Sequence, residues 1–405
     1  MAKLSAARKQ LQGLTLTFHD GVVATLHKTF LRDNCPKHRH PTSNQKLVSP
    51  ANIPLDLDVD KLKVHEDHLT VTWSPDSHES KYPTTWLREV SETLVPDKAH
   101  ERRLGDIKVP QVEWEKARGD DAVMRWVVES IGDKGAVLFS DVPQVQGMVA
   151  QVARLIGPLQ PNIYGDVFDV VTTPVPINIA YSSHALPPHM DLCYYESPPG
   201  LQLLHCLSFD DETQGGESFL IDGFGVANTL RDSAPDAFEV LSRVPATFVK
   251  DHSQRDLPVL MSYSRPHITL CPQGRVVGFF WSPPFEGPLR VSQSDAAMYY
   301  DAYRTIDEHI NRAPRWNHRL CPGELLIFNN RRMLHGRSEI FPPRTEASAT
   351  DSKSRWLQGC YINIDEFANR YNIDLRDSKV QGEASKCSLG NQDWGSGPVV
   401  LCKYP

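Results

Sequence analysis

The sequence lacks three features that would place it in common classes of protein. Its 405 residues include 43 basic and 50 acidic ones, and the net charge of −7 provides no basic field for nucleic acid. No apolar run reaches the roughly 20 residues that a membrane-spanning helix needs. The eight cysteines show no spacing typical of a disulfide framework, which indicates a reducing compartment. We therefore expect neither nucleic acid nor a membrane as a partner.

The N-terminal segment also lacks the apolar core of a secretory signal. It is basic, since its first acidic residue is Asp20, so a mitochondrial presequence is the alternative. Arginine and serine, which such presequences favour, are sparse in it. Together with the cysteine usage, this predicts a cytoplasmic protein.

The chain has more prolines (31) than glycines (24), which favours many short strands and loops over a helical bundle. Apolar and polar residues alternate around Asp20-Gly21, which predicts a β-hairpin, and they alternate again over residues 69–73. A charged, turn-rich segment follows at 96–110. We predict a small β-rich domain over residues 1–105 and a larger domain over residues 106–405.

The larger domain opens with helical patterns and continues mostly with strands. An amphipathic helix from residue 121, a turn at 132–135 and a buried strand are followed by a second helix over 145–157. Strand patterns dominate from residue 178, interrupted by helical patterns at 225–244 and 292–312. Many short strands after two leading helices predict a double-sheet barrel of the jelly-roll type.

The segment "LPPHMDLCYYESPPGLQLLHC" places His189 and Asp191 two residues apart. In or beside a strand, alternate residues face the same side, so an imidazole and a carboxylate would point to one place. An isolated pair of this kind is more often a surface histidine and aspartate near a turn. A third ligand is needed to decide between the two interpretations.

His335 offers that ligand, after the apolar strand pattern at 325–328 and a turn. Two imidazoles and one carboxylate leave three coordination positions open on Fe(II), where a cosubstrate and dioxygen can bind. A tight zinc site more often uses three or four nitrogen and sulfur donors. Arg355, at the head of a late strand, has a planar guanidinium suited to a bidentate grip on a carboxylate such as that of 2-oxoglutarate.

These motifs resemble those of the γ-butyrobetaine and trimethyllysine dioxygenases, within the taurine-dioxygenase-like group of Fe(II)/2-oxoglutarate oxygenases. The matching segments are, in order, "NIAYSS", "HMDLCYYESPPGLQLLHC", "GGESFLIDGF", "FNNRRMLHGR" and "SRWLQGCY". "FLRDNCP" and "TWSPDSH" resemble the small accessory domain of that family. The resemblance implies a mainly β fold with flanking helices, in which a double-stranded β-helix (jelly-roll) catalytic core follows a small β-rich N-terminal domain.

The resemblance also implies roles for individual residues. His189, Asp191 and His335 would bind the iron, and Arg355 would anchor 2-oxoglutarate. Two more residues would line the cosubstrate and substrate side of the site: Leu204 and Asn178. Members of the family often form homodimers, so a homodimer is implied on that ground alone.

The expected substrate pocket departs from the family, whose aromatic cage attracts a trimethylammonium group to ring faces. Tyr164 and Tyr361 match two cage positions, whereas Phe168 stands where tryptophan is usual. We also expect Tyr181 and Ser282 to contact the substrate. Ser282 lies in "GFFWSPPFEGP", which replaces an Asn-rich stretch of the family and whose prolines remove amide donors.

A further departure is the polar segment 342–353, "PPRTEASATDSK", which is longer than in the family and predicts a surface loop or lid. These changes argue against strict γ-butyrobetaine specificity. They favour a related small zwitterion, such as an amino acid or another betaine.

The small domain of the family binds zinc through three cysteines and a distant histidine. Only Cys35 is present among the cysteines here, but His38, His40 and His78 are available. Because imidazole can replace thiolate, these four residues could hold structural zinc. The alternative is a basic loop that has lost its metal.

The sequence thus predicts an Fe(II)- and 2-oxoglutarate-dependent dioxygenase that uses O2 to oxidise an unactivated C–H bond of a small amino-acid-like substrate in specialised metabolism. Succinate and CO2 would be the coproducts, and hydroxylation, cyclisation and desaturation are all open outcomes. One alternative is a γ-butyrobetaine or trimethyllysine hydroxylase of carnitine biosynthesis. Another is a metal-binding sensor without turnover. A zinc hydrolase with the same triad is a further alternative, but Arg355 would have no role in its reaction.

Overall fold

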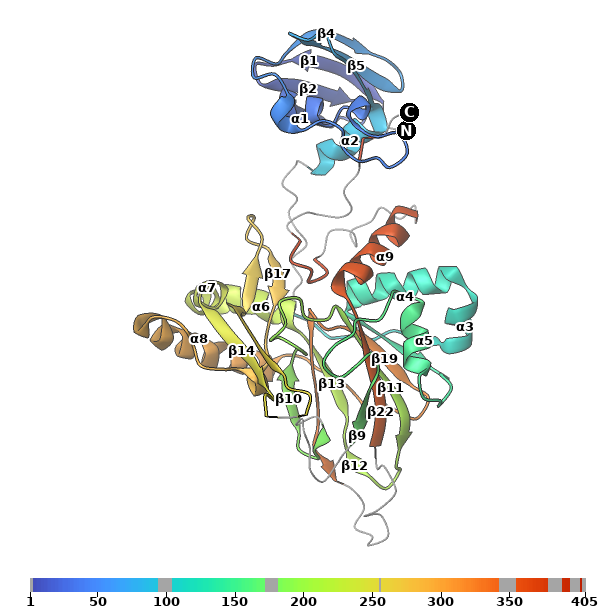
Figure 1. The fold of residues 1–405 in the computed structure, drawn as a ribbon, viewed down its shortest axis with the longest axis vertical. Helices are drawn as coiled ribbons and strands as arrows, with labels where there is room; N and C mark the ends of the chain where they lie inside the picture. The colour runs from blue at the N-terminus through green and yellow to red at the C-terminus, as the bar shows by residue number, and fades with distance from the viewer. Residues whose placement is uncertain are drawn as a thin grey trace. The chain divides into compact units, whose positions relative to one another are not determined.

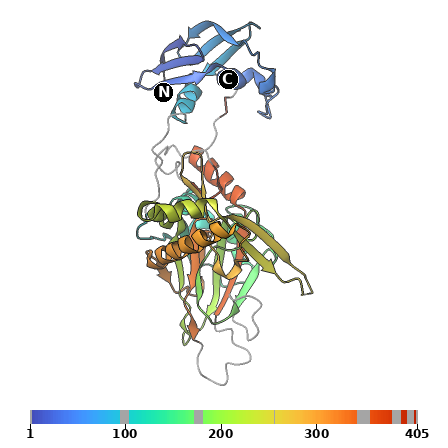
Figure 2. The same cartoon turned by 90° about the vertical axis from the view of Figure 1, so that its left-hand side faces the viewer.

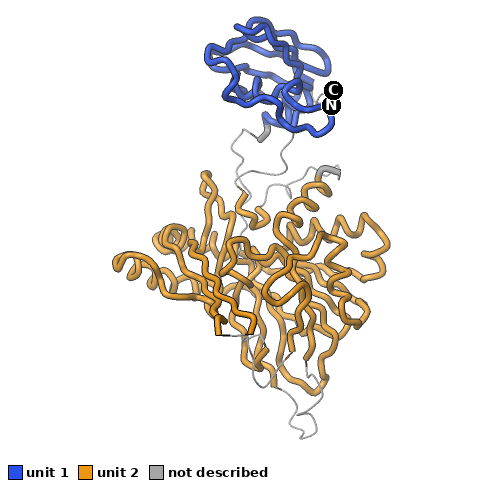
Figure 3. The backbone as a smooth tube through the Cα atoms, in the orientation of Figure 1, with its two compact units in different colours: residues 1–99, 398–405 blue, residues 100–397 orange. Residues whose placement is uncertain are grey.

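The computed structural model describes residues 3–93, 104–171, 181–254, 256–341, 355–377, 388–393 and 401–402. The chain divides into two compact units, residues 1–99 with 398–405 and residues 100–397 (Figure 3). The end of the chain therefore belongs to the first unit, whereas the sequence grouped it with the larger domain. Asn178 and the expected surface loop at 342–353 lie outside the described residues.

The first unit contains two antiparallel three-stranded sheets and short helices. Its strands are β1 (Leu4–Lys9), β2 (Gly13–Phe18), β3 (Val23–His27), β4 (Asp58–Val64), β5 (His68–Ser74) and β6 (Glu79–Pro83). Its helices are α1 (Lys28–Asp33), η1 (Pro36–His38), η2 (Pro50–Asn52) and α2 (Thr84–Thr93). The predicted hairpin is confirmed, because β2 pairs with β3 across a turn in which Gly21 has a φ of 87°. β5 buries every second residue, as its alternating pattern predicted.

Two facing sheets form the centre of the second unit (Figure 1). The larger sheet has the order β7 (Gln111–Glu113), β8 (Ala136–Ser140), β19 (Leu325–Asn329), β11 (Leu201–Phe209), β22 (Arg355–Ile362), β9 (Phe168–Val171). The smaller sheet has the order β10 (Leu186–His189), β20 (Met333–Arg337), β13 (Ser218–Asp222), β18 (Trp316–His318). This is the double-stranded β-helix that the resemblance implied, and the mainly β fold is confirmed.

β11 shows how the alternation of side chains builds two cores at once. Leu201 and Leu203 point to the helical layer and pack with helix residues such as Val149. Cys206 points to the opposite sheet and packs with Leu220 of β13. The inner face of this strand is therefore the one that can line a site between the two sheets.

Helices and short hairpins cover both sides of the second unit. On one side α3 (Trp114–Gly119), α4 (Asp121–Lys134), α5 (Met148–Arg154) and α9 (Ile364–Asp377) pack on the larger sheet. On the other lie α6 (Gly223–Ser233), α7 (Pro235–Arg243) and α8 (Gln293–Arg312), which Figure 2 shows in front of the sheets. The remaining elements are β12 (Gln214–Gly215), β14 (Pro245–Asp251), β15 (Leu260–Pro266), β16 (Ile268–Leu270), β17 (Val276–Phe279), η4 (Pro283–Phe285) and β21 (Ile340–Phe341). None of the helices in the described part of the chain is long and apolar enough to span a membrane.

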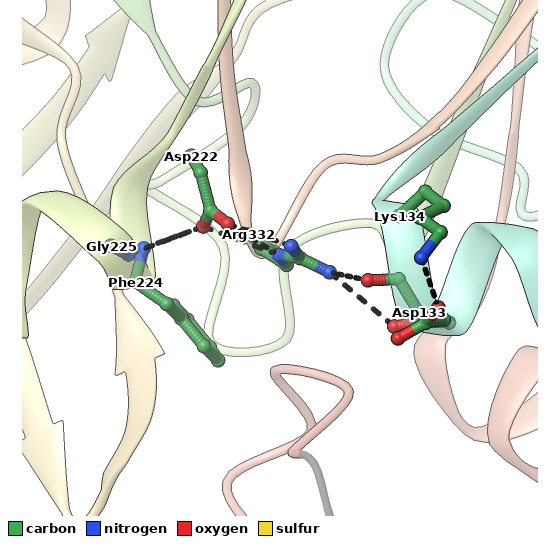
Figure 4. Close-up of polar contacts among 7 residues, drawn as sticks. Asp133, Lys134, Asp222, Phe224, Gly225 and Arg332 are labelled. Carbon is green, nitrogen blue, oxygen red and sulfur yellow. Dashed lines mark hydrogen bonds and ion pairs between the residues drawn. The ribbon is translucent and has the colours of Figure 1, made fainter. Parts of the chain in front are cut away.

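A buried ion pair connects the helical layers to the loop that precedes His335 (Figure 4). Arg332 Nη2 lies 2.6 Å from Asp222 Oδ2 at the end of β13. Arg332 Nη1 also donates to the carbonyl oxygen of Asp133, near the end of α4. Asp222 Oδ1 in turn accepts from the backbone N–H groups of Phe224 and Gly225 and so caps α6.

Candidate active site

His189 and Asp191 lie at the point where β10 ends. The Nδ1 atom of His189 lies 2.9 Å from the carbonyl oxygen of Pro187, which can only accept, so Nδ1 carries the proton. In the neutral imidazole this places the lone pair on His189 Nε2, the nitrogen that can bind a metal. His189 Nε2 lies 3.4 Å from Asp191 Oδ1, so the two side chains of the His-x-Asp pair do point to one place.

His335 joins them because β10 pairs with β20 in a register that sets His189 opposite His335. His335 Nε2 lies 3.8 Å from Asp191 Oδ2, and the candidate ligand atoms of all three residues lie within 4.8 Å of one another. Burial and the neighbouring His189 lower the pKa of His335 to about 3. Its imidazole is therefore neutral at physiological pH, as a metal ligand must be.

The charge of Asp191 is retained although the carboxylate is largely buried. Burial alone would raise the pKa of Asp191, but its polar neighbours His189, His335 and Tyr361 lower it well below its usual range. Tyr361 adds a hydrogen bond of 2.7 Å from its hydroxyl to Asp191 Oδ2. An ionised carboxylate with two imidazoles is a donor set that suits Fe(II).

Asn330 holds Asp191 in place, and our interpretation of the sequence missed it. Its Oδ1 accepts from the backbone N–H of Asp191 at 2.9 Å, and its Nδ2 donates to the carbonyl oxygens of Asp191 and Pro199. The side chain is only 1% exposed. The motif "FNNRR", which begins in the last residues of β19 and precedes His335, was the available signal, since asparagines that become buried at a strand end need partners.

Arg355 lies at the start of β22 and lines the same cavity as the three candidate ligands. It is 4% exposed, and burial together with Arg337 and Arg319 lowers its pKa to about 9. Within the described residues its buried Nε has no hydrogen-bond partner. A buried guanidinium with an unused donor fits a carboxylate, which is the part of 2-oxoglutarate that needs such a partner.

Three aromatic residues expected in the substrate pocket form a continuous wall. The Phe168 ring centroid lies 5.1 Å from that of Tyr361 and 6.1 Å from that of Tyr164. Phe168 approaches closely because β9 pairs with β22 at Gly359, where a Cβ atom would lie 2.5 Å from the Phe168 ring. Tyr181 and Leu204 also line this cavity.

The lining differs from expectation in one segment. Ser282 is fully buried, but the cavity is lined there by Pro284 and Phe285, which follow it in η4. Sequence reasoning also missed Gln202 on the inner face of β11, whose buried Oε1 has no partner among the described residues. The period of two along β11 could have identified it, because it places Gln202 on the same face as Leu204.

The first unit contains a second group of candidate metal ligands. Cys35, His38 and His78 have their ligand atoms within 4.8 Å of one another, and Cys35 Sγ lies 3.3 Å from His78 Nε2. Burial and the charge of Arg32 lower the pKa of His78 to about 4, which keeps its imidazole neutral. His40 is exposed, and its Nδ1 accepts from the backbone N–H of Ser43. It does not belong to this group.

Two models of known protein families match this chain and together cover most of it. The family model "Taurine catabolism dioxygenase TauD, TfdA family" matches residues 99–361, and the model "Gamma-butyrobetaine hydroxylase-like, N-terminal" matches residues 6–94. The protein is thus an Fe(II)/2-oxoglutarate-dependent dioxygenase that acts on a small molecule. The chain belongs to the TauD/TfdA family and carries the N-terminal domain of the γ-butyrobetaine hydroxylases, which confirms the resemblance seen in the motifs.

Three curated relatives match over most of their length. The gamma-butyrobetaine dioxygenase of Pseudomonas sp. (strain AK-1) is 30% identical over 383 residues, which cover 91% of this chain and 96% of that protein. Dioxygenase str8 of Strobilurus tenacellus is 29% identical over 362 residues, covering 84% and 83%. The trimethyllysine dioxygenase of Meyerozyma guilliermondii is 25% identical over 387 residues, covering 89% and 93%.

Proposed function

We propose that His189, Asp191 and His335 bind the Fe(II) of this dioxygenase and that Arg355 anchors 2-oxoglutarate. The observation that carries the proposal is a single cavity lined by all four residues and by the aromatic wall. The donor set fits, because the three ligand atoms are close together and buried, and because Asp191 is ionised and His335 is neutral at neutral pH. The unused Nε of Arg355 supports its assignment to a carboxylate.

We propose that the substrate is a small zwitterion of the amino-acid type and that the protein acts in specialised metabolism. Phe168 offers a smaller π-face than the tryptophan that is usual at this position. Pro284 and Phe285 supply an apolar lining without amide side chains where the family has asparagines. Both differences weaken a site for a long betaine and suit a compact substrate.

Each residue of the cavity has a distinct task in this proposal. When bound, the iron and 2-oxoglutarate together with O2 oxidise a substrate C–H bond while 2-oxoglutarate is converted to succinate and CO2. Tyr361 and Asn330 orient the carboxylate and the backbone of Asp191. Leu204 and Phe168 close the walls and exclude water from the reacting atoms. Which outcome follows, hydroxylation, cyclisation or desaturation, depends on how the cavity positions the oxidised substrate.

The test is turnover by the full-length protein, loaded with Fe(II) and 2-oxoglutarate without oxygen and then exposed to air with single candidate substrates. The panel contains small aliphatic amino acids, γ-butyrobetaine and trimethyllysine, and succinate and product mass are followed together. We expect an amino acid to gain one oxygen or lose two hydrogens. His189→Ala and Asp191→Ala should each abolish this turnover, whereas His309→Ala on α8 should not. Full activity in both ligand variants would exclude the proposed iron site.

A carnitine-type activity on γ-butyrobetaine or trimethyllysine is the second candidate. It is favoured by the wall of Tyr164, Phe168 and Tyr361 and by the relatives that carry those names. Gain of one oxygen by either betaine, with no amino acid turned over, would establish it in place of the first. A sensor without turnover would produce no substrate-linked succinate with any member of the panel.

We further propose that Cys35, His38 and His78 hold a structural zinc ion in the first unit. The three residues are buried or half-buried and their ligand atoms converge. Metal analysis of protein purified without chelators should find about one zinc per chain, and Cys35→Ala should remove it while His40→Ala should not. Zero zinc in the unaltered protein would exclude the site.

A further inference from the structure

Lys250 is a buried lysine beside the candidate substrate cavity. It lies on β14, on the same face of the strand as Ala246 and Phe248, which are both buried in the core. Lys250 is itself only 4% exposed. Lysine is rarely so deeply buried, because removing its charge from water is costly. A lysine at a core position of a strand therefore indicates a specific role.

The ammonium group of Lys250 faces two rings that line the cavity. Its Nζ lies 4.9 Å from the ring centroid of Phe285 and 6.0 Å from that of Tyr164. The π-faces that could attract a substrate cation at this end thus already face a cation of the protein. Tyr164 is one of the residues that match the trimethylammonium cage of the family.

The segment that departs from the family is the one that brings Phe285 to Lys250. Glu286 forms a backbone bridge with Phe248, and the N–H of Gly287 donates to the carbonyl oxygen of Thr247 at 2.8 Å. η4 is thereby held along β14, and its residue Phe285 reaches the cavity. The altered loop and the buried lysine form one structural unit.

We propose that Lys250 determines the charge of the substrate: it selects a carboxylate at the Tyr164–Phe285 end of the cavity and rejects a quaternary ammonium there. This inference rests on the proposed function, since it takes the cavity to be the substrate site. A substrate charge in contact with the opposite face of the Phe285 ring would lie roughly 8 Å from Nζ, the sum of the centroid distance and a van der Waals contact. At an effective dielectric constant of about 20, one unit charge at that distance changes binding by roughly 30-fold.

The test measures binding, so that it does not depend on turnover. The full-length protein is loaded without oxygen with Fe(II) and with saturating 2-oxoglutarate. The 2-oxoglutarate occupies the proposed carboxylate site at Arg355, so that the probes do not bind there. Three probes of the same branched shape are then titrated by calorimetry. They are tert-butylacetate (the anion of tert-butylacetic acid), neohexanol, which has the same tert-butyl head and is neutral, and choline, whose trimethylammonium head is cationic. We expect tert-butylacetate to bind most tightly and choline most weakly.

Lys250→Met keeps the length of the side chain and removes its charge. In this variant the preference for tert-butylacetate over neohexanol should fall by roughly 30-fold. Lys250→Arg should keep the order of the three probes, as should Lys116→Met, which removes an exposed charge on α3. If Lys250→Met does not fold, the order of the three probe affinities in the unaltered protein and in Lys250→Arg still tests the proposal.

Two results would overturn the assignment: choline binding more tightly than tert-butylacetate in the unaltered protein, or an unchanged preference for tert-butylacetate over neohexanol in Lys250→Met. The outcome is separable from that of the proposed function. If no amino acid is turned over but the expected order of probes is found, the proposed reaction fails and the role of Lys250 stands. If an amino acid is turned over but choline is preferred, the reaction stands and the role of Lys250 fails.

Discussion

The buried pair of Asp222 and Arg332 offers a quantitative test of how the site is supported. Asp222→Asn removes the charge but keeps a side-chain oxygen for the N–H groups of Phe224 and Gly225, and asparagine caps a helix as well as aspartate does. The variant therefore isolates the loss of the partner of Arg332, without loss of the cap.

The expected cost follows from burial. Asp222 is 7% exposed and Arg332 6%, and their closest contact is 2.6 Å. Leaving one member of such a pair unpaired costs about 3–5 kcal/mol. The carbonyl oxygens of Gly132 and Asp133 still accept from Arg332, so we expect about 3 kcal/mol, near the lower limit. For a large domain this lowers Tm by roughly 6–12 °C.

Scanning calorimetry of the full-length protein measures the effect. The transition of the first unit serves as an internal control, because the pair lies wholly in the second unit. Asp301→Asn breaks an exposed pair with Arg304, whose side chains are 79% and 73% exposed, and should leave Tm unchanged. The double variant Asp222→Asn/Arg332→Met should lose less unfolding free energy than the sum of the losses in the two single variants. A Tm for Asp222→Asn within a degree of the unaltered protein would refute the reasoning.

Three further predictions concern the cavity and its surroundings. Arg355→Gln should raise the 2-oxoglutarate concentration for half-maximal succinate formation about 10- to 100-fold, because the bonds of a charged donor are lost; steady-state kinetics with an unchanged requirement would contradict the anchor. Tyr361→Phe, which lacks the hydroxyl bonded to Asp191, should weaken Fe(II) binding about 10- to 100-fold in a metal titration, and unaltered affinity would rule out this support. Burial raises the pKa of Glu286 from 4.5 to about 7 against the opposing hydrogen bond from Tyr303, so the unfolded chain loses this proton at lower pH than the folded one. Stability should therefore decline by roughly 3 kcal/mol as the pH rises from 4.5 to 7, and Glu286→Gln should flatten this part of the pH profile of urea denaturation.

The local patterns of the chain were sufficient for much of the fold. The alternation at 69–73 became β5, and the periodic segment from residue 121 became α4, ended by Gly135 with a φ of 90°. Both depend on side chains and backbone preferences within a few residues, which is why they can be predicted. The segment 225–244 is divided into α6 and α7 at Ala234 and Pro235, where proline begins a new helix.

The expected site residues show where such prediction stops. His189 and Asp191 could be paired from their spacing, but Ser282 could not be separated from Pro284 and Phe285, because its position depends on how η4 packs along β14. His40 is as close in sequence to Cys35 as a ligand should be, yet the turn after η1 directs it to solvent. Asn330 and Gln202 acquire their importance only from partners far away in the sequence.

The sequence by itself determined the class of this protein, because the spacing of a metal-binding motif and the period of a strand are local properties of the chain. It also determined that Arg355 would begin a strand and that aromatic residues would be available for a pocket. The register that sets His189 opposite His335, the glycine that admits Phe168 and the packing of Lys250 against Phe285 arise from contacts between distant segments. Such contacts form only when the strands pair and the core closes, since each depends on the volume and charge of its neighbours in three dimensions.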